Sequence, residues 1–285
     1  AYLPRFPREG GEIRQESQVK TLRRPTLDYK VDLRDVKFQL FEWLKLGELL
    51  NEEKYADWDA ENVEMVLDEG LKIAQEQLAA CNEDGDRIGA QWSDGTVTLP
   101  ESFKPVWDTI SEGGWIGLMG SPEFGGMGLP DIVGTVVAEF FYGGNTSLNL
   151  TVMLTRGAAA LIEGFGTDET KGLFVEKLYS GTWAGTMCLT EAQAGSDVGA
   201  SSTKAIKQDD GSYMITGEKI FITGGDHNLT DNIIHLVLAR TPDAPGGTKG
   251  LSLFIVPKVK VNADGSPGES NDVFCNNIEE KMGIH

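Results

Sequence analysis

The sequence predicts an α+β protein with an all-helical N-terminal domain followed by an antiparallel, barrel-like β domain. Before residue 180, apolar residues recur at spacings of three and four, which is typical of amphipathic helices. After Gly181, short runs rich in β-branched residues alternate with turn signals such as Asp209-Asp-Gly211. The length of 285 residues fits this division, since a domain usually has about 100–200 residues.

The N-terminal part divides into an arm and a helical domain. Residues 1–34 are rich in proline and charge and show no sustained period, so we expect an extended arm there. Residues 35–180 form the expected helical domain. Helices are expected around Leu40–Leu44, along 58–81, after Pro100, and over about 130–142, 148–165 and 168–179.

A glycine-rich segment, residues 114–130, lies inside the helical domain. It lacks the GxxxxGK[ST] order of a phosphate-binding loop and follows no convincing strand. The better interpretation is a connector, dense in turns, between two helices.

Residues 181–285 form the expected β domain. The apolar, β-branched runs predict strands over 182–190, 201–207, 212–216, 218–223, 232–239 and 251–256.

The composition excludes some classes of function. The formal net charge of −19 opposes binding to nucleic acid, whose affinity comes mainly from lysine and arginine on phosphates. It disfavours anionic membrane surfaces for the same reason. The three cysteines have no CxxC spacing, which predicts a reducing compartment, and we expect a cytoplasmic protein. The most apolar stretch, about 148–165, contains Arg156 and Glu163, so no membrane span is expected.

Two segments of the β domain carry the pattern of a cofactor site. They are Met187-Cys-Leu-Thr-Glu-Ala-Gln-Ala-Gly-Ser-Asp-Val198 and Ile215-Thr-Gly-Glu-Lys-Ile-Phe-Ile-Thr-Gly-Gly225. Both place hydroxyl groups beside aromatic or apolar neighbours. A planar cofactor with a hydrogen-bonding edge needs such a surface.

This pair of segments resembles the middle domain of the acyl-CoA dehydrogenases. The resemblance extends over about residues 35–285 and includes Gly114–Pro130 and Lys281-Met-Gly-Ile-His285. The run from Ile222 to Arg240 is similar to the long-form branch that contains methylthiopropanoyl-CoA and fatty acyl-CoA dehydrogenases. The resemblance implies FAD as cofactor and an acyl-CoA as substrate.

The resemblance also implies the residues of the flavin site. Thr190 and Thr223 would hydrogen-bond the flavin, and Phe221 would cover its ring where many relatives carry Trp. Ser196 would lie along the acyl-CoA or the diphosphate. The implied cofactor-binding residues are Met187, Leu189, Thr190, Gly195, Ser196, Phe221, Ile222 and Thr223.

Ordinary structural roles compete with these functions. Threonine is common in strands, and Ser196-Asp197 fits a turn. Asp226-His227 suggests an acid/base pair but fits an Asx-type turn equally well, and no partner ligands suggest a metal.

For Glu191, which lies in a tight turn, a structural role is favoured over proton abstraction. An anionic CoA ester would need local cations, for which Lys204, Lys207, Lys258 and Lys260 are candidates.

The family reaction uses a glutamate base from a C-terminal helical bundle, which this sequence does not contain, so we assign no catalytic residue here. The protein could be one subunit of a split enzyme, a fragment, or a non-catalytic relative used for interaction. We favour an enzyme half that works with a second chain carrying the C-terminal helical domain, in a homo- or hetero-oligomer. An electron-transferring flavoprotein is the implied electron acceptor. A flavin oxidase or monooxygenase of the same fold is the alternative.

Overall fold

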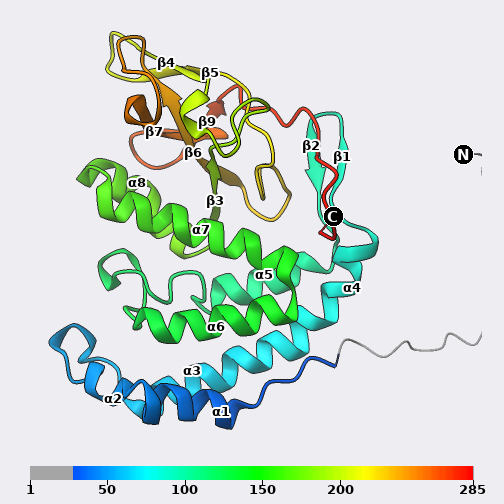
Figure 1. Cartoon of the computed structure of the whole chain (residues 1–285), viewed down its shortest axis with the longest axis vertical. Coiled ribbons are helices and arrows are strands. Elements are labelled where there is room, and N and C mark those ends of the chain that lie inside the picture. The colour runs from blue at the N-terminus through cyan, green and yellow to red at the C-terminus, as the bar shows by residue number, and fades with distance from the viewer. Residues whose placement is uncertain (1–27, 285) are drawn as a thin grey trace, which may run out of the picture.

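Layers of helices carry a mixed β-sheet on one side in the computed structural model, which describes residues 28–284 (Figure 1). Residues 1–27 of the arm predicted over 1–34 lie outside the described part. The predicted fold class is confirmed, because residues 28–179 are mainly helical and the main sheet begins at Trp183.

The helices begin at residues that can cap them. The side chains of Asp59, Asn145 and Thr167 accept hydrogen bonds from the first-turn amides of α3, α7 and α8. The helical elements are α1 (Leu33–Lys37), η1 (Phe38–Trp43), α2 (Leu46–Leu49), η2 (Glu53–Tyr55), α3 (Ala60–Ile73), η3 (Ala74–Leu78), α4 (Ala79–Arg87), α5 (Phe103–Glu112), η4 (Pro122–Phe124), α6 (Asp131–Gly144), α7 (Thr146–Phe165), α8 (Asp168–Tyr179), η5 (Val198–Ala200) and η6 (Thr248–Gly250).

The glycine-rich segment 114–130 is the predicted connector. It joins α5 to α6 and contains the short η4. Gly120 packs so closely against the Tyr179 ring that an added Cβ would lie 2.4 Å from it. Small residues are therefore needed where the connector rests on α8.

The main sheet contains β3 (Trp183–Cys188), β4 (Lys204–Lys207), β5 (Tyr213–Thr216), β6 (Asn232–Arg240) and β7 (Leu251–Pro257). It is mixed, whereas the sequence predicted antiparallel strands. β6 pairs parallel with β3 and β4 and antiparallel with β7. Cys188 pairs with Val237, and Lys204 pairs with Arg240 farther along the same strand. β3 and β4 therefore follow one side of β6 in the same direction, and residues 189–203 loop out between them.

The strand predicted over 218–223 is wrong. Phe221 has a left-handed backbone with φ 57°, which breaks an extended chain. The segment runs beside the loop after β3, where the Ile220 amide donates to the Thr190 carbonyl at 2.9 Å.

Two hairpins were not predicted. One pairs β1 (Gln91–Ser93) with β2 (Thr96–Thr98), and the other pairs β8 (Val259–Val261) with β9 (Pro267–Ser270). Asp94 and Gly95 both have positive φ between β1 and β2, as a tight hairpin turn requires. The Trp92 indole of β1 donates to the Cys275 carbonyl at 2.8 Å, which ties this hairpin to the C-terminal segment.

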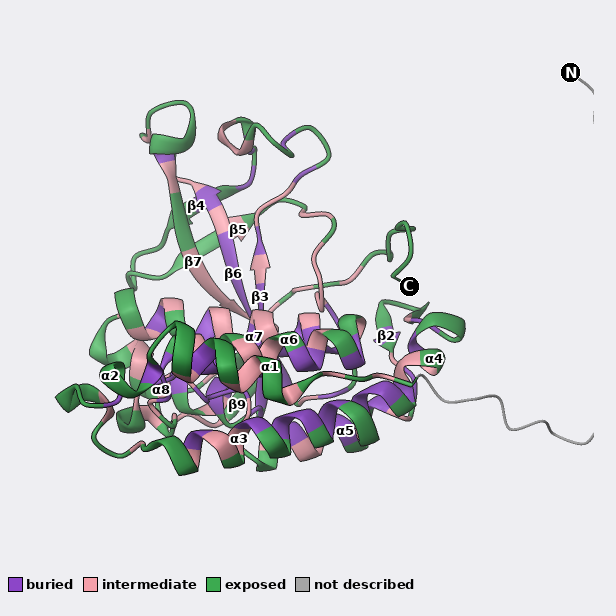
Figure 2. Ribbon diagram, turned by 60° about the horizontal axis from the view of Figure 1, so that its bottom comes forward, coloured by how far each residue is buried: buried purple, intermediate pink, exposed green. Residues whose placement is uncertain are grey.

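Helix α7 joins the helical layers to the sheet. It lies directly against β3, and both elements are largely buried along this contact (Figure 2). The Gly185 amide of β3 donates to the Thr155 hydroxyl of α7 at 3.1 Å. A Cβ at Gly185 would lie 2.5 Å from the Ala158 Cβ, so the closeness of the contact depends on glycine.

Some apolar side chains of the sheet face solvent. Ile206 on β4, Met214 on β5 and Leu253 on β7 are 42%, 59% and 42% exposed. Strand β5 also lies at an edge of the main sheet.

We expect Gly185→Ala to lower the free energy of unfolding by about 1–3 kcal/mol, because the added methyl group forces α7 away from β3. Denaturant titration measures this change. Gly157→Ala on α7 is the matched control, since nothing lies within 4 Å of its added Cβ and alanine favours the helix. Equal stabilities of the two variants would contradict the assigned contact.

Candidate functional site

Two segments far apart in sequence lie side by side at the end of β3. They are the loop that begins at Leu189 and the segment 217–225. The Lys219 ammonium group donates to the Leu189 carbonyl at 2.9 Å, and the Ile220 amide donates to the Thr190 carbonyl at 2.9 Å. The two halves of the predicted cofactor site are therefore joined by one side-chain and one backbone hydrogen bond, both to backbone carbonyls.

The place where the loop from Leu189 meets the segment 217–225 is called the junction below. Five of the predicted site residues lie at this junction. Leu189, Thr190, Ile222 and Thr223 are half-buried, and Phe221 is 49% exposed. Neither threonine hydroxyl has a hydrogen-bond partner among the described residues.

The other three predicted residues lie apart from that group. Met187 is half-buried and packs on the apolar cluster formed with α7 and α8. Gly195 and Ser196 are exposed in the loop. The structure thus gathers five of the predicted residues and leaves Met187, Gly195 and Ser196 at the margin.

Glu191 organises the loop from within. It is 3% exposed, and its carboxylate accepts a hydrogen bond from the Lys219 ammonium group at 2.8 Å. The amides of Ser202 and Thr203 donate to it at 2.7 and 3.0 Å. The hydroxyls of Ser201, Ser202 and Thr203 and the amide side chain of Gln193 also donate. One carboxylate therefore links three separate stretches of chain.

This environment fixes the charge of Glu191. Burial alone would raise the pKa of the carboxyl group, but the hydrogen bonds from Lys219, Ser201, Thr203 and the Ser202 amide outweigh it. The pKa of Glu191 is held well below its usual range. The structural role predicted for Glu191 fits this geometry.

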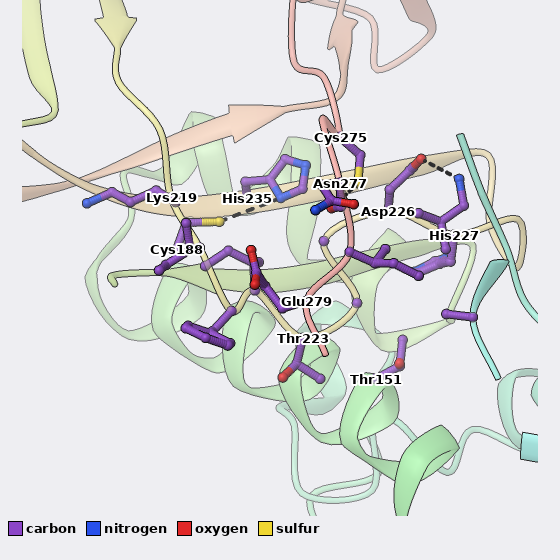
Figure 3. Close-up of a pocket in the computed structure, with 18 of the residues that line it drawn as sticks. Thr151, Cys188, Lys219, Thr223, Asp226, His227, His235, Cys275, Asn277 and Glu279 are labelled. Atoms are coloured by element: carbon purple, nitrogen blue, oxygen red, sulfur yellow. Dashed lines mark hydrogen bonds between the residues drawn. The ribbon is translucent and has the colours of Figure 1, made fainter. Parts of the chain in front are cut away.

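A cavity of about 730 Å³ opens beside the junction. Phe221, Ile222 and Thr223 line it, together with Thr151 of α7 and the C-terminal segment 271–284. Figure 3 shows Thr223 and Thr151 on one side and Cys188 and His235 of the sheet on the other. The C-terminal segment shows no periodic signal in the sequence, and Thr151 resembles an ordinary helix residue.

Asp226 and His227 do not form the acid/base pair suggested by their adjacency. The Asp226 carboxylate pairs with Lys258 and accepts from the Val97 amide at 3.1 Å. The Nδ1 of His227 accepts from the Leu229 amide at 3.2 Å. These bonds make Asp226-His227 part of the turn, with Asp226 tying that turn to β2.

The buried imidazoles of His227 and His235 line the cavity. Burial lowers the pKa of each to about 4; Asp226 opposes this effect and Lys258 adds to it. His235 was not predicted as a site residue, although it lies on the same face of the sheet as Cys188. Its Nδ1 lies 2.7 Å from the Thr186 hydroxyl.

The lysines considered for a CoA ester are only partly available. Lys258 pairs with Asp226, and Lys260 pairs with Glu269 at 2.7 Å. Lys204 and Lys207 of β4 are exposed and form no ion pair within residues 28–284. No cluster of three or more His, Cys, Asp or Glu side chains suited to a metal ion occurs among the described residues.

Comparison with known proteins identifies the family. The model of the acyl-CoA dehydrogenase N-terminal domain matches residues 61–182, and that of the middle domain matches residues 186–284. The chain belongs to the acyl-CoA dehydrogenase family. The resemblance inferred from the sequence motifs is thereby confirmed.

Similar proteins include curated acyl-CoA dehydrogenases of two bacteria. The chain is 40% identical over 261 residues to 3-methylmercaptopropionyl-CoA dehydrogenase of Ruegeria pomeroyi, covering 90% of this chain and 44% of that protein. It is 41% identical over 262 residues to a broad-specificity linear acyl-CoA dehydrogenase of Mycobacterium tuberculosis, covering 90% and 42%. The chain thus spans less than half the length of these two relatives.

A solved structure supports the fold of this family member. The acyl-CoA dehydrogenase of Bacillus anthracis complexed with FAD matches with a TM-score of 0.58 and 22% identity, covering 73% of this chain and 33% of that one.

Between residues 28 and 284, no helix has the length and apolar character needed to cross a membrane.

We expect the free energy of unfolding to fall as pH decreases from 6.5 towards 4. An unfolded histidine binds a proton near pH 6.5, whereas His227 and His235 stay neutral in the fold down to about 4. Each contributes up to about 1.4 kcal/mol per pH unit in this window. Denaturant titrations at pH 7, 6 and 5 measure the slope, and His227→Gln should reduce it. An unchanged slope in that variant would contradict the buried neutral state.

Proposed function

We propose that this chain forms the flavin-binding part of an FAD-dependent acyl-CoA dehydrogenase that converts an acyl-CoA to a 2-enoyl-CoA. The joined segments 189–190 and 219–223 carry this proposal. They combine the exposed Phe221 ring with two threonine hydroxyls that have no hydrogen-bond partner within residues 28–284. Membership of the family and the FAD complex of a structural neighbour support the same cofactor.

The residues present suit a flavin. The Phe221 ring offers an apolar cover, and the hydroxyls of Thr190 and Thr223 offer hydrogen bonds to a polar ring edge. Leu189 and Ile222 are half-buried apolar residues of the same two segments, and we propose Met187 and Gly195 as further contacts of the cofactor. Ser196 is exposed and available to the diphosphate or to the acyl-CoA. FAD, when bound, supplies a hydride acceptor for the β-carbon of the acyl-CoA.

Glu191 does not supply the catalytic base. A base for the weakly acidic α-proton must take up a proton near the working pH. The Glu191 carboxylate has its oxygens engaged by seven donors and stays ionised far below that pH. We propose instead that a glutamate of a C-terminal helical domain, as the family reaction uses, acts as the base, and that the enzyme works as a homo- or hetero-oligomer.

The remaining parts of the proposal follow from family membership and the sequence. We propose residues 1–34 as an arm, 35–180 as the helical domain and 181–285 as the domain that contacts flavin. We propose an electron-transferring flavoprotein as electron acceptor. The free cysteines Cys81, Cys188 and Cys275 support a reducing, cytoplasmic location.

The visible absorption spectrum of the natively purified protein, with every co-purifying chain retained, tests the proposal. A flavin spectrum that bleaches when butyryl-CoA is added without oxygen supports the dehydrogenase. Rapid recovery of the bleached flavin in air, with formation of hydrogen peroxide, would favour an oxidase. A colourless protein that binds no added FAD would favour a non-catalytic interaction subunit.

We expect Thr190→Val and Thr223→Val each to weaken FAD binding by about tenfold, because each removes a hydrogen bond of about 1.4 kcal/mol. Titration with FAD, followed by flavin fluorescence, measures the dissociation constant. Thr248→Val is the control, since Thr248 is exposed at the start of η6. Wild-type affinity in both site variants would overturn these assignments.

A further inference from the structure

Glu191 and Lys219 form a buried ion pair. Within residues 28–284, it is the only ion pair in which both side chains are less than 10% exposed. The side chains of Lys219 and Glu191 are 9% and 2% exposed. Every other ion pair of the described residues has at least one partner that is 27% exposed or more. Burial of two charges is costly unless they are paired and hydrogen-bonded, so this pair needs the donors that surround it.

The hydrogen bonds of this pair continue into the cofactor junction. Lys219 bonds both the Glu191 carboxylate and the Leu189 carbonyl. The next residue, Ile220, donates its amide to the Thr190 carbonyl, and Phe221 then takes its left-handed backbone. The position of Phe221 and Thr223 relative to Leu189 and Thr190 is thus set by contacts that begin at Glu191.

The same carboxylate holds the loop from its other end. The amides of Ser202 and Thr203 bond it just before β4 begins at Lys204. Residues 189–203 leave the sheet after β3 and return to it at β4, so Glu191 closes this loop across its base. A neutral side chain offers fewer acceptor sites and no charge to Lys219.

We propose that Glu191 is a positioning residue for flavin binding, holding the segments 189–190 and 219–223 in the relative placement that the cofactor requires. This inference rests on the proposed function. It assigns Glu191 no contact with the substrate and no proton transfer.

The hydrogen bonds from Lys219 and the Ser202 and Thr203 amides to the Glu191 carboxylate are called the clamp below. Hydrogen exchange of the Ile220 amide, measured without FAD, tests this clamp directly. Because Glu191→Gln removes the charge that holds Lys219, we expect exchange at Ile220 to accelerate by about tenfold or more. Glu269→Gln is the matched control, since Glu269 pairs with Lys260 on the exposed β8–β9 hairpin. Unchanged exchange in Glu191→Gln would overturn the clamp.

FAD affinity tests whether the clamp positions the cofactor site. We expect Glu191→Gln to raise the dissociation constant for FAD by about tenfold or more and to alter the visible circular dichroism of the bound flavin. Glu269→Gln should change neither. Wild-type affinity and dichroism in Glu191→Gln, together with faster exchange at Ile220, would overturn the positioning role.

The double variant Glu191→Gln/Lys219→Met separates positioning from general stability. Glu191→Gln alone leaves a buried ammonium group without its partner, and Lys219→Met removes that group. We expect the melting temperature to recover in the double variant while FAD affinity stays low, because no carboxylate links the segments. Recovery of both would show that Glu191 acts through stability alone and would overturn the inference.

If the wild-type protein binds no FAD, the proposed function and the positioning role both fail. Exchange at Ile220 still tests whether the clamp exists.

Discussion

The contact of α7 with β3 at Gly185 is the constraint on which the arrangement of this molecule depends. β3 lies at the edge of the sheet and uses one side of its backbone to pair with β6. On its other side, the Gly185 amide is satisfied by the Thr155 hydroxyl of a helix instead of a strand. The helix thereby covers this edge of the sheet along β3. The end of β3 then delivers Leu189 and Thr190 to the junction.

Beyond the end of the sheet, polar side-chain contacts set the positions of the backbone. Residues 189–203 and 217–225 contain no regular strand, so they cannot rely on a ladder of backbone hydrogen bonds to set their positions. A buried carboxylate with several donors gives a specific geometry instead, because each missing bond would leave a buried polar group unpaired. Irregular backbone at this place leaves hydroxyls and an aromatic ring available on a well-defined support.

The parts predicted well from sequence were those governed by local pattern. The stripe from Val63 to Cys81 and the change of period at Gly181 predicted the helices and the sheet. The directions of β3 and β4 could not be predicted, since they depend on how the loop between them returns to β6. The Ile220-Phe-Ile222 run looks like a strand, and only tertiary contacts with the Thr190 loop explain its left-handed turn. For the site, the motifs predicted the two segments of the proposed flavin site, but the partners of Glu191 and the position of His235 could be known only from the fold. The Asp94-Gly95 turn was a readable hairpin signal in the sequence.

The exposed apolar side chains of β4, β5 and β7 affect how readily separate molecules of this protein associate in solution. Ile206, Met214 and Leu253, next to an unpaired strand edge, provide a surface on which sheets of separate molecules can associate. The net charge of −19 opposes that approach through repulsion between molecules. This repulsion reaches only about 10 Å at 0.1 M salt and about 3 Å at 1 M. Dilute buffers therefore keep the molecules apart. Concentrated salt removes the repulsion, and kosmotropic salts such as sulfate also strengthen the attraction between the apolar surfaces.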